Sequence, residues 1–255
     1  MRSVTHGIII GILWCYCGHA QNSAHYTKVS YTTSLEKDLS GQRFSELLFT
    51  SSHACYIEGE FKVKTTQENA IVKEEAGNEL KVLYYTNQLE KKLYTRDKLD
   101  KKIVYVEEKT PVIAWEIHQN SVQSIMGLTC VKATGSFRGR EYTVYFTPDI
   151  PVPFGPWKLQ GLPGLILEAK DHLNQVHFMA TKIKQYKEEL PKEFFRFQTL
   201  DKNKIITLQE YVTQRDKEIQ AKVRKLIATM PRESKVNNSK SYKYQGLELT
   251  YEWEE

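Results

Sequence analysis

The sequence predicts a β-dominated α+β protein: a curved antiparallel sheet or open barrel, with one long C-terminal helix packed on it. Most of the chain alternates apolar and polar residues with a period of two, the pattern of strands that bury one face. One segment near the C-terminus instead repeats apolar residues with a helical period. A hydrophobic content of 40% in 255 residues can fill one core, so we expect a single globular domain over residues 21–255.

The first twenty residues have the three-part pattern of a secretory signal peptide. Arg2 precedes an apolar run over residues 7–18, and Gly18 and Ala20 place small side chains just before Gln21. A helix of that length rises about 18 Å, less than the roughly 30 Å of a bilayer core, so the run is short for a permanent span. We therefore expect an exported protein, periplasmic or secreted, that begins at Gln21 and has no transmembrane segment in the mature chain.

Removal of residues 1–20 leaves two cysteines, Cys55 and Cys130. In an oxidising compartment, two cysteines are consistent with one disulfide. The geometry that a disulfide requires cannot be deduced from sequence, so two buried thiols are the equal alternative. We predict the disulfide between Cys55 and Cys130.

Strands are expected wherever apolar and polar residues alternate. The clearest such segments are residues 80–84, 103–108, 113–117, 142–146, 176–180 and 247–253. Turn-forming sequences lie between them: residues 137–140 (FRGR) and 171–175 (DHLNQ) are each expected at a hairpin tip. Together these patterns predict a meander of eight to ten strands.

The helix is expected from Thr207 to Met230, with Pro231 ending it. Thr207 and Glu210 have the spacing of a capping box, in which each side chain satisfies a backbone N–H of the other. Basic residues occupy the face opposite the apolar one, as in helices that bind membranes or calmodulin. Interspersed acidic residues favour an ordinary helix packed across the sheet. The apolar stripe consists of Leu208, Val212, Ile219, Val223, Leu226 and Ile227.

Five of the eight prolines lie between Pro148 and Pro163. Proline fixes φ and lacks an N–H donor, so this segment is expected to be a stiff, extended loop. We predict a rigid rim folded against the sheet, with Trp157 as the principal anchor and Gly161 and Gly164 needed for backbone shape. Its aromatic side chains either dock a partner or plug the core. The candidate binding residues are Phe154, Gly155, Pro156, Trp157, Gly161, Leu162, Pro163 and Gly164.

Residues 161–166 read GLPGLI, and the chain resembles the GLPGLI family, exported Gram-negative proteins of unknown function that are named for this motif. The resemblance runs from Trp115 to Tyr186 and includes residues 130–133 (CVKA), 137–140 (FRGR) and 155–158 (GPWK). One departure is residues 245–249 (QGLEL), where the family more often reads Asn-Pro-Ile-Glu-Leu. The resemblance implies an exported location and carries over no catalytic residue.

Two groups of residues have side chains that could carry chemistry. His172 and His177, together with Asp171, have a loose metal-site spacing, but a solvated turn is favoured. Asp149, Glu168 and Asp171 flank the motif, and paired carboxylates could hydrolyse a glycosidic bond. These carboxylates are expected instead to be solvated or paired with an arginine of the FRGR segment. We therefore assign no catalytic residue, no metal site and no cofactor.

Composition narrows the class of partner. The formal charge is +5, with basic and acidic residues interspersed along most of the chain, so we expect no nucleic-acid binding. We expect a non-catalytic envelope protein that binds an apolar or amphipathic ligand, or a membrane-associated envelope partner, between sheet and helix. The alternatives are an envelope hydrolase that uses carboxylates near the GLPGLI motif, and a structural or scaffolding partner.

Overall fold

The computed structural model describes most of the chain after residue 24. The predicted signal peptide, its cleavage site before Gln21, and Pro231 lie outside the described residues. The described ranges are residues 25–35, 43–59, 61–65, 71–75, 82–100, 102–195, 197, 199–201, 204–229 and 246–254.

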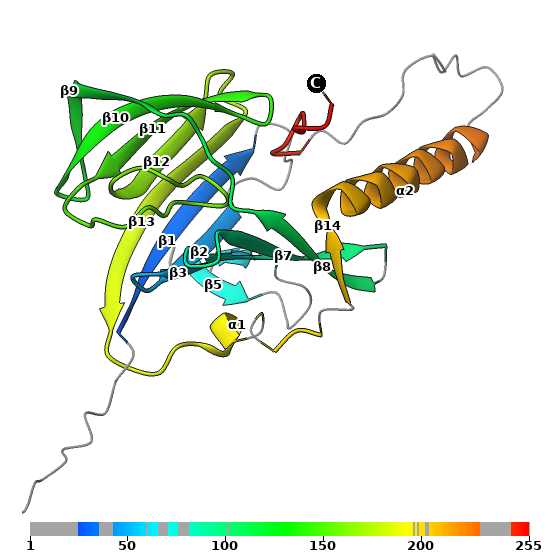
Figure 1. Ribbon diagram of the computed structural model, residues 1–255, viewed down its shortest axis with the longest axis horizontal. Helices are drawn as coiled ribbons and strands as arrows, with labels where there is room; N and C mark the ends of the chain where they lie inside the picture. Colours follow the sequence, from blue (N-terminus) through cyan, green and yellow to red (C-terminus); the bar gives the residue numbers. More distant parts are fainter. Residues whose placement is uncertain are drawn as a thin grey trace, which may run out of the picture.

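Twelve strands form one sheet in the order β14-β8-β7-β6-β3-β2-β1-β13-β12-β11-β10-β9 (Figure 1). Neighbouring strands are antiparallel except for β14 and β8, which are parallel. The sheet is mixed and does not close, and β4 (Phe61–Thr65) and β5 (Ile71–Glu75) form a separate antiparallel pair. The twelve strands are β1 (Tyr26–Leu35), β2 (Arg43–Phe49), β3 (His53–Gly59), β6 (Val82–Asn87), β7 (Lys92–Leu99), β8 (Lys102–Lys109), β9 (Glu116–Ile125), β10 (Leu128–Phe137), β11 (Arg140–Thr147), β12 (Leu165–Asp171), β13 (Val176–Tyr186) and β14 (Ile205–Thr207).

The β-dominated fold class predicted from the sequence is confirmed, as are both hairpin tips. The sheet has more strands than the expected eight to ten. The predicted C-terminal strand is wrong: residues 246–254, here called the C-terminal segment, form no strand. The backbone N–H groups of Leu249 and Thr250 instead donate to the carbonyl oxygen of Arg138, at 2.9 and 3.3 Å, so the segment lies against a hairpin tip.

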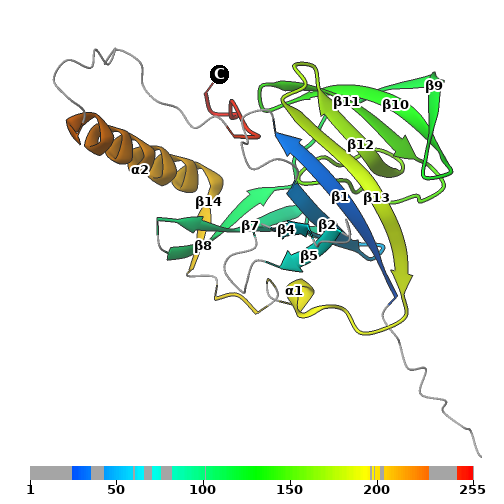
Figure 2. The same cartoon turned by 180° about the vertical axis from the view of Figure 1, so that it is seen from behind.

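The sheet bends along its length, so that β7 and β8 run across the direction of β1 and β13 in both views (Figures 1 and 2). The main core lies among β1 to β3, β9 to β13 and the proline-rich loop. Tyr31 illustrates how that core is held, because its buried hydroxyl donates to the carbonyl oxygen of Ile166 at 2.6 Å. A second core forms near helix α1 (Lys192–Phe195), where Tyr85 stacks on Phe197.

Helix α2 (Leu208–Thr229) begins at the expected capping box: Glu210 N donates to Thr207 Oγ1 (3.2 Å), and Thr207 N donates to Glu210 Oε2 (2.8 Å). The expectation that its whole apolar stripe packs across the sheet is wrong. Only Leu208 and Val212 are buried among its residues, because the helix starts at an edge strand and then leaves the sheet (Figure 1). Neither helix within the described ranges is long and apolar enough to span a bilayer.

Candidate functional site

The proline-rich segment is a buried loop between β11 and β12. Residues 154–160 are all buried, which is unusual because loops normally run over the surface. Backbone hydrogen bonds fix it in place: Ile166 N donates to Phe154 O (3.0 Å), and Gly161 N donates to Pro153 O (2.8 Å). The loop therefore behaves as part of the core rather than as a flexible connection.

Two glycines of the motif serve the loop in different ways. Gly161 has a φ of +97°, in the left-handed region that side chains rarely adopt. Gly164 has no positive φ, but a Cβ at this position would lie 2.3 Å from the carbonyl oxygen of Thr147. The first glycine is needed for backbone conformation and the second for close approach.

The aromatic side chains of the loop plug the core. Phe154 and Trp157 are 1% and 5% exposed. The Trp157 ring packs on Phe137 with 5.5 Å between centroids, and Phe154 packs on Phe49 at 5.9 Å. The structure thus places Trp157 in the core rather than on an exposed rim. Of the other candidate binding residues, Gly155, Pro156, Leu162 and Gly164 are buried, whereas Gly161 and Pro163 are exposed.

Four largely buried charges meet beside this loop, and we call Glu108, Arg138, Lys158 and Glu248 the ion cluster. Arg138, at the hairpin tip between β10 and β11, donates to Glu108 Oε2 (2.6 Å) and to Glu248. Lys158, from the proline-rich loop, donates to Glu248 Oε1 (2.8 Å) and to Glu108. Their side chains are between 3% and 13% exposed. Two cations oppose two carboxylates, the balance that allows charge to be buried.

The cluster shifts the pKa of Glu248 and of Arg138. Burial by itself would raise the pKa of the Glu248 carboxyl, but Lys158 and Arg138 outweigh it and lower the pKa overall. For Arg138, burial would lower the pKa, whereas Glu248 and Glu108 raise it overall. Glu248 and Arg138 are therefore both charged near neutral pH.

Arg140 holds the C-terminal segment against the sheet. Its Nη1 donates to Asp171 Oδ2 (2.6 Å), its Nη2 to the carbonyl oxygen of Gly246 (2.9 Å) and its Nε to that of Leu247 (3.1 Å). The expected pairing of a motif carboxylate with an FRGR arginine is confirmed for Asp171. The two arginines of FRGR thus position one wall of the site.

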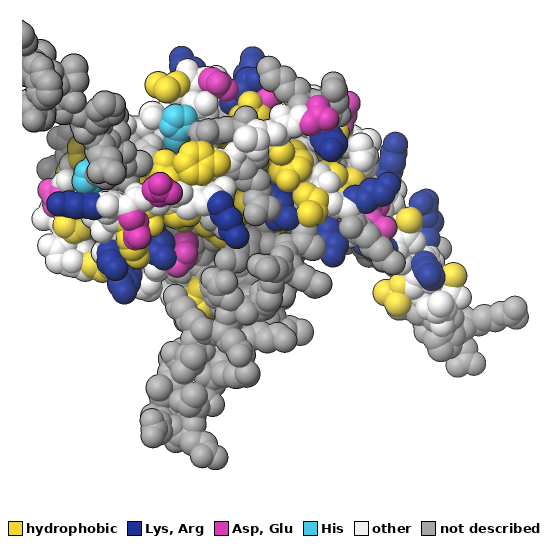
Figure 3. Space-filling model, turned by 90° about the horizontal axis from the view of Figure 1, so that it is seen from below, with side chains coloured by type: hydrophobic (Ala, Val, Ile, Leu, Met, Phe, Trp, Pro, Cys, Tyr) yellow, Lys and Arg dark blue, Asp and Glu magenta, His cyan; other side chains and the backbone are white. Residues whose placement is uncertain are grey.

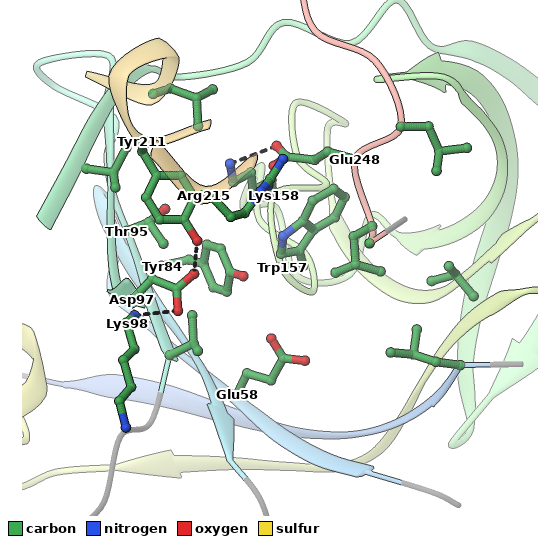
Figure 4. Close-up of a pocket in the computed structure, with 18 of the residues that line it drawn as sticks. Glu58, Tyr84, Thr95, Asp97, Lys98, Trp157, Lys158, Tyr211, Arg215 and Glu248 are labelled. Carbon is green, nitrogen blue, oxygen red and sulfur yellow. Dashed lines mark hydrogen bonds and ion pairs between the residues drawn. The ribbon is translucent and has the colours of Figure 1, made fainter. Parts of the chain in front are cut away.

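A pocket of about 830 Å³ opens beside the ion cluster, between the sheet, the first turns of α2 and the C-terminal segment (Figure 4). Three aromatic rings line it: Tyr84 from β6, Trp157 from the proline-rich loop and Tyr211 from α2. Lys158 and Glu248 also line it, so the ion cluster forms part of its wall. The pocket therefore joins a rigid polar wall to an aromatic one.

The opposite side of the pocket carries carboxylates. Tyr211 Oη donates to Asp97 Oδ2 at 2.5 Å, and the Glu58 side chain points into the pocket from β3 (Figure 4). Burial, together with Glu58 and Asp97, raises the pKa of Tyr84 well above its ordinary value, so its hydroxyl stays neutral. The pocket thus presents both polar groups and apolar surface, which suits an amphipathic ligand.

The three carboxylates near the motif lie in different surroundings. Asp149 is exposed, whereas Glu168 accepts a hydrogen bond from Gln123 (2.8 Å) and lies 2.9 Å from His177 Nε2. Asp171 accepts a hydrogen bond from Arg140. These side-chain contacts of Glu168 and Asp171 are thus with amide or basic side chains.

The two histidines of the loose metal-site spacing, His172 and His177, have different neighbours. His172 Nδ1 lies 4.0 Å from Glu141, and His177 lies against Glu168. In the part of the chain that the structure describes, no three His, Cys, Asp or Glu side chains are grouped to hold a metal ion.

Cys55 and Cys130 are buried thiols, and the predicted disulfide between them is wrong. Cys55 lies on β3 in the core near α1, and Cys130 lies on β10 in the main core. Five strands separate β3 from β10 in the sheet. Burial raises the pKa of the Cys130 thiol to about 11, the opposite of what a thiolate nucleophile needs.

Sequence reasoning missed the ion cluster and the aromatic pocket wall. Arg138 and Lys158 both lie in segments that resemble the GLPGLI family. A sequence motif does not, however, identify the acidic residues that contact these two side chains in the folded chain. Glu248 gave no signal either, because it falls at a polar position of the strand-like C-terminal pattern. Tyr84 and Tyr211 gave no distinguishing signal.

The hairpin tip and the loop of this site coincide with a known sequence pattern. A family model described as "Protein of unknown function (Porph_ging)" matches residues 137–168. The matched stretch contains Arg138, Arg140, Lys158 and the complete proline-rich loop, and it is compatible with a GLPGLI-type family. A search of curated proteins finds no match.

Solved structures show a distant likeness. Two structures of PNGF-II, in different space groups, each align with a TM-score of 0.53, at 18% and 17% identity. They cover 75% of this chain but 33% and 32% of their own, so this chain spans about a third of the length of the PNGF-II chains. At this identity the likeness concerns the fold alone. MucB in complex with MucA(peri) aligns with 8% identity over 68% of this chain and 54% of its own, and its TM-score of 0.27 is too low to indicate a shared fold.

Proposed function

We propose that this protein is a non-catalytic exported protein that binds an amphipathic ligand in the pocket beside the ion cluster. The observation that carries the proposal is the pocket itself. Its volume of about 830 Å³ falls within the range of small-molecule sites, which combine apolar walls with a few polar groups. Tyr84, Trp157 and Tyr211 supply the rings, while charged side chains of both signs in the lining, Glu58 and Lys98 among them, supply polar partners for a head group.

The pocket walls are held in place before a ligand arrives. Lys158 and Glu248 are bonded to each other, and Arg140 fixes the backbone carbonyls that precede Glu248. A preformed site avoids the entropy cost of ordering side chains on binding. This rigidity supports binding as the role of the ion cluster.

The hydrolase alternative has less support. Glycoside hydrolysis needs a protonated carboxylic acid beside a second carboxylate. Glu108 and Glu248 both bind Lys158, so they lie close together, but the lowered pKa of Glu248 makes it a poor proton donor near neutrality. The exported location rests on the sequence pattern of residues 1–20 and on the family resemblance.

The test uses residues 21–255 and a dansyl-labelled fatty acid as the probe. Val82 lines the pocket, so Val82→Trp is expected to narrow it and to weaken probe binding by roughly tenfold or more. Val122→Trp is the matched control, because Val122 is 59% exposed on β9. Thermal unfolding confirms that both variants fold. Equal affinity of all three proteins, or no binding by the native chain, contradicts the proposal.

A further inference from the structure

We propose that the distal half of α2, residues 217–229, is an amphipathic surface helix that binds an anionic lipid membrane. This inference does not depend on the pocket. It starts from the apolar stripe that the sheet leaves uncovered beyond Val212. Leu226 is 58% exposed, and Ile219, Val223 and Ile227 are partly exposed.

The position of the helix makes this surface accessible. Its buried residues, Leu208 and Val212, belong to the first two turns, where α2 meets β14 and β8. Beyond them the helix projects from the sheet (Figures 1 and 2), and hydrophobic and basic side chains lie side by side on the projecting arm (Figure 3). A helix whose apolar face is not used by the fold is expected to bury it elsewhere.

Charge is concentrated at the same place. The distal half contains Lys217, Lys222, Arg224 and Lys225, against the single acid Glu218. In the sequence, residues 217–245 hold eight basic and two acidic side chains, a net charge of +6. The complete chain carries +5, so all other residues together carry −1. The positive charge of this protein is thus gathered in and directly after the helix, a pattern that complements an anionic surface.

Apolar and basic residues are arranged as an interfacial helix requires. At 3.6 residues per turn, Ile219, Val223 and Leu226 fall on one side of the helix. Lys217 and Arg224 fall on the opposite side. Long basic side chains between the two faces can extend toward head groups while their methylene stems stay in the apolar layer.

A membrane fits these residues better than a protein or a nucleic acid does. Protein interfaces are enriched in aromatic side chains and depleted in lysine, whereas the distal half has three lysines and no aromatic residue. A phosphate backbone would explain the basic residues but gives no role to Leu226 or Ile219. A lipid surface with anionic head groups accounts for both.

The experiment is flotation of the chain spanning residues 21–255 with two kinds of vesicle, pure phosphatidylcholine and phosphatidylcholine mixed with phosphatidylglycerol. We expect binding to the mixed vesicles, weakened by salt, and little binding to the neutral ones. Substituting Lys222→Gln, Arg224→Gln and Lys225→Gln together should reduce partitioning by roughly tenfold or more. The charge-matched control carries glutamine at three exposed lysines of the sheet, Lys102, Lys170 and Lys182, and should partition as the native chain does.

The apolar stripe is tested separately with Leu226→Ser, which should also lower partitioning. Leu89→Ser is its control, because Leu89 is 76% exposed in a turn of the sheet. Failure of the native chain to bind mixed vesicles, or equal binding by all variants, overturns the proposal. Self-association of the native chain that Leu226→Ser abolishes also overturns it, as does heparin binding that persists in Leu226→Ser while no lipid binding is seen. A large loss of thermal stability in Leu226→Ser overturns it as well, because the chain itself would then cover the stripe.

Discussion

Lys158 Nζ donates to Glu248 Oε1 at 2.8 Å, joining the proline-rich loop to the C-terminal segment between side chains 90 positions apart in the sequence. Both side chains are largely buried, at 3% and 13% exposure, and both line the pocket. The contact therefore links the stability of the fold to the shape of the pocket. Disruption of either partner leaves a charge in a place where water cannot fully solvate it.

Replacing Glu248 with glutamine should destabilise the protein by about 3 kcal/mol, because Arg138 and Lys158 would then share one buried carboxylate, that of Glu108. Glu252→Gln is the matched control: Glu252 also accepts a hydrogen bond from Arg138, but its side chain is 62% exposed. We expect this control to change stability by about 0.5 kcal/mol or less. Urea unfolding measures the free energy of unfolding of both variants. Equal losses of stability would show that burial of the ion cluster does not contribute to the stability of the protein.

The contribution of Glu248 should depend on pH in a defined direction. Burial raises its pKa, but Lys158 and Arg138 lower it below the ordinary value of 4.5 in the folded state. The folded protein therefore binds this proton less strongly than the unfolded chain does. The stabilisation is complete above about pH 4.5 and is lost as the pH falls through the folded pKa.

The difference in unfolding free energy between the native protein and Glu248→Gln should accordingly shrink as the pH is lowered from about 6 to about 3. Urea titrations at several pH values in this window test it. A difference that stays constant with pH would contradict a lowered pKa for Glu248.

Local patterns in the sequence predicted much of the fold. Alternation located β8, β11 and β13, turn residues located the tips at residues 137–140 and 171–175, and the Thr207 and Glu210 spacing located the start of α2. These features depend on interactions between near neighbours in the chain. Strand order depends instead on contacts between segments that are distant in the chain. For example, β1 lies between β2 and β13, and β3 lies beside β6.

The site was harder to predict because its partners are remote in sequence. Residues 247–253 alternate apolar and polar side chains as a half-exposed strand does. This pattern predicts that Glu248 faces water. In the fold, Arg138 and Lys158 compensate its charge, so the carboxylate turns inward. For α2, periodicity correctly predicted an apolar stripe but could not show that the sheet ends beneath Val212.

Cys55 and Cys130 should be unreactive toward thiol reagents in the folded protein and fully reactive in denaturant. Both are 0% exposed, and burial raises the pKa of Cys130 to about 11, so roughly a thousandth of that thiol is ionised at pH 8. The measurement is a colorimetric thiol count on residues 21–255 without reductant. Two thiols per chain in denaturant are expected, and a count of zero would restore the disulfide.

Gly164→Ala should destabilise the protein more than Gly127→Ala does. A Cβ at position 164 would lie 2.3 Å from the carbonyl oxygen of Thr147, so the backbone must move, at a cost of roughly 3 kcal/mol. Gly127 has a φ of +81° but nothing within 4 Å of such a Cβ, so strain alone should cost about 1 kcal/mol. Urea unfolding of both variants compares the cost of steric crowding with the cost of backbone strain. A larger loss of stability in Gly127→Ala would contradict the explanation that Gly164 is needed for close approach to Thr147.

Trp157→Ala should destabilise the protein by about 3 to 5 kcal/mol, because the ring is 5% exposed and packs on Phe137. Trp253→Ala is the comparison, since Trp253 is 38% exposed in the C-terminal segment and should cost about 1 kcal/mol or less. Trp157→Phe retains part of the apolar contact, so it separates stability from pocket shape: the variant should fold and bind the fatty acid probe more weakly. If Trp157→Ala proved as stable as the native chain, the ring would not be part of the core, and its role as an exposed docking anchor would have to be reinstated.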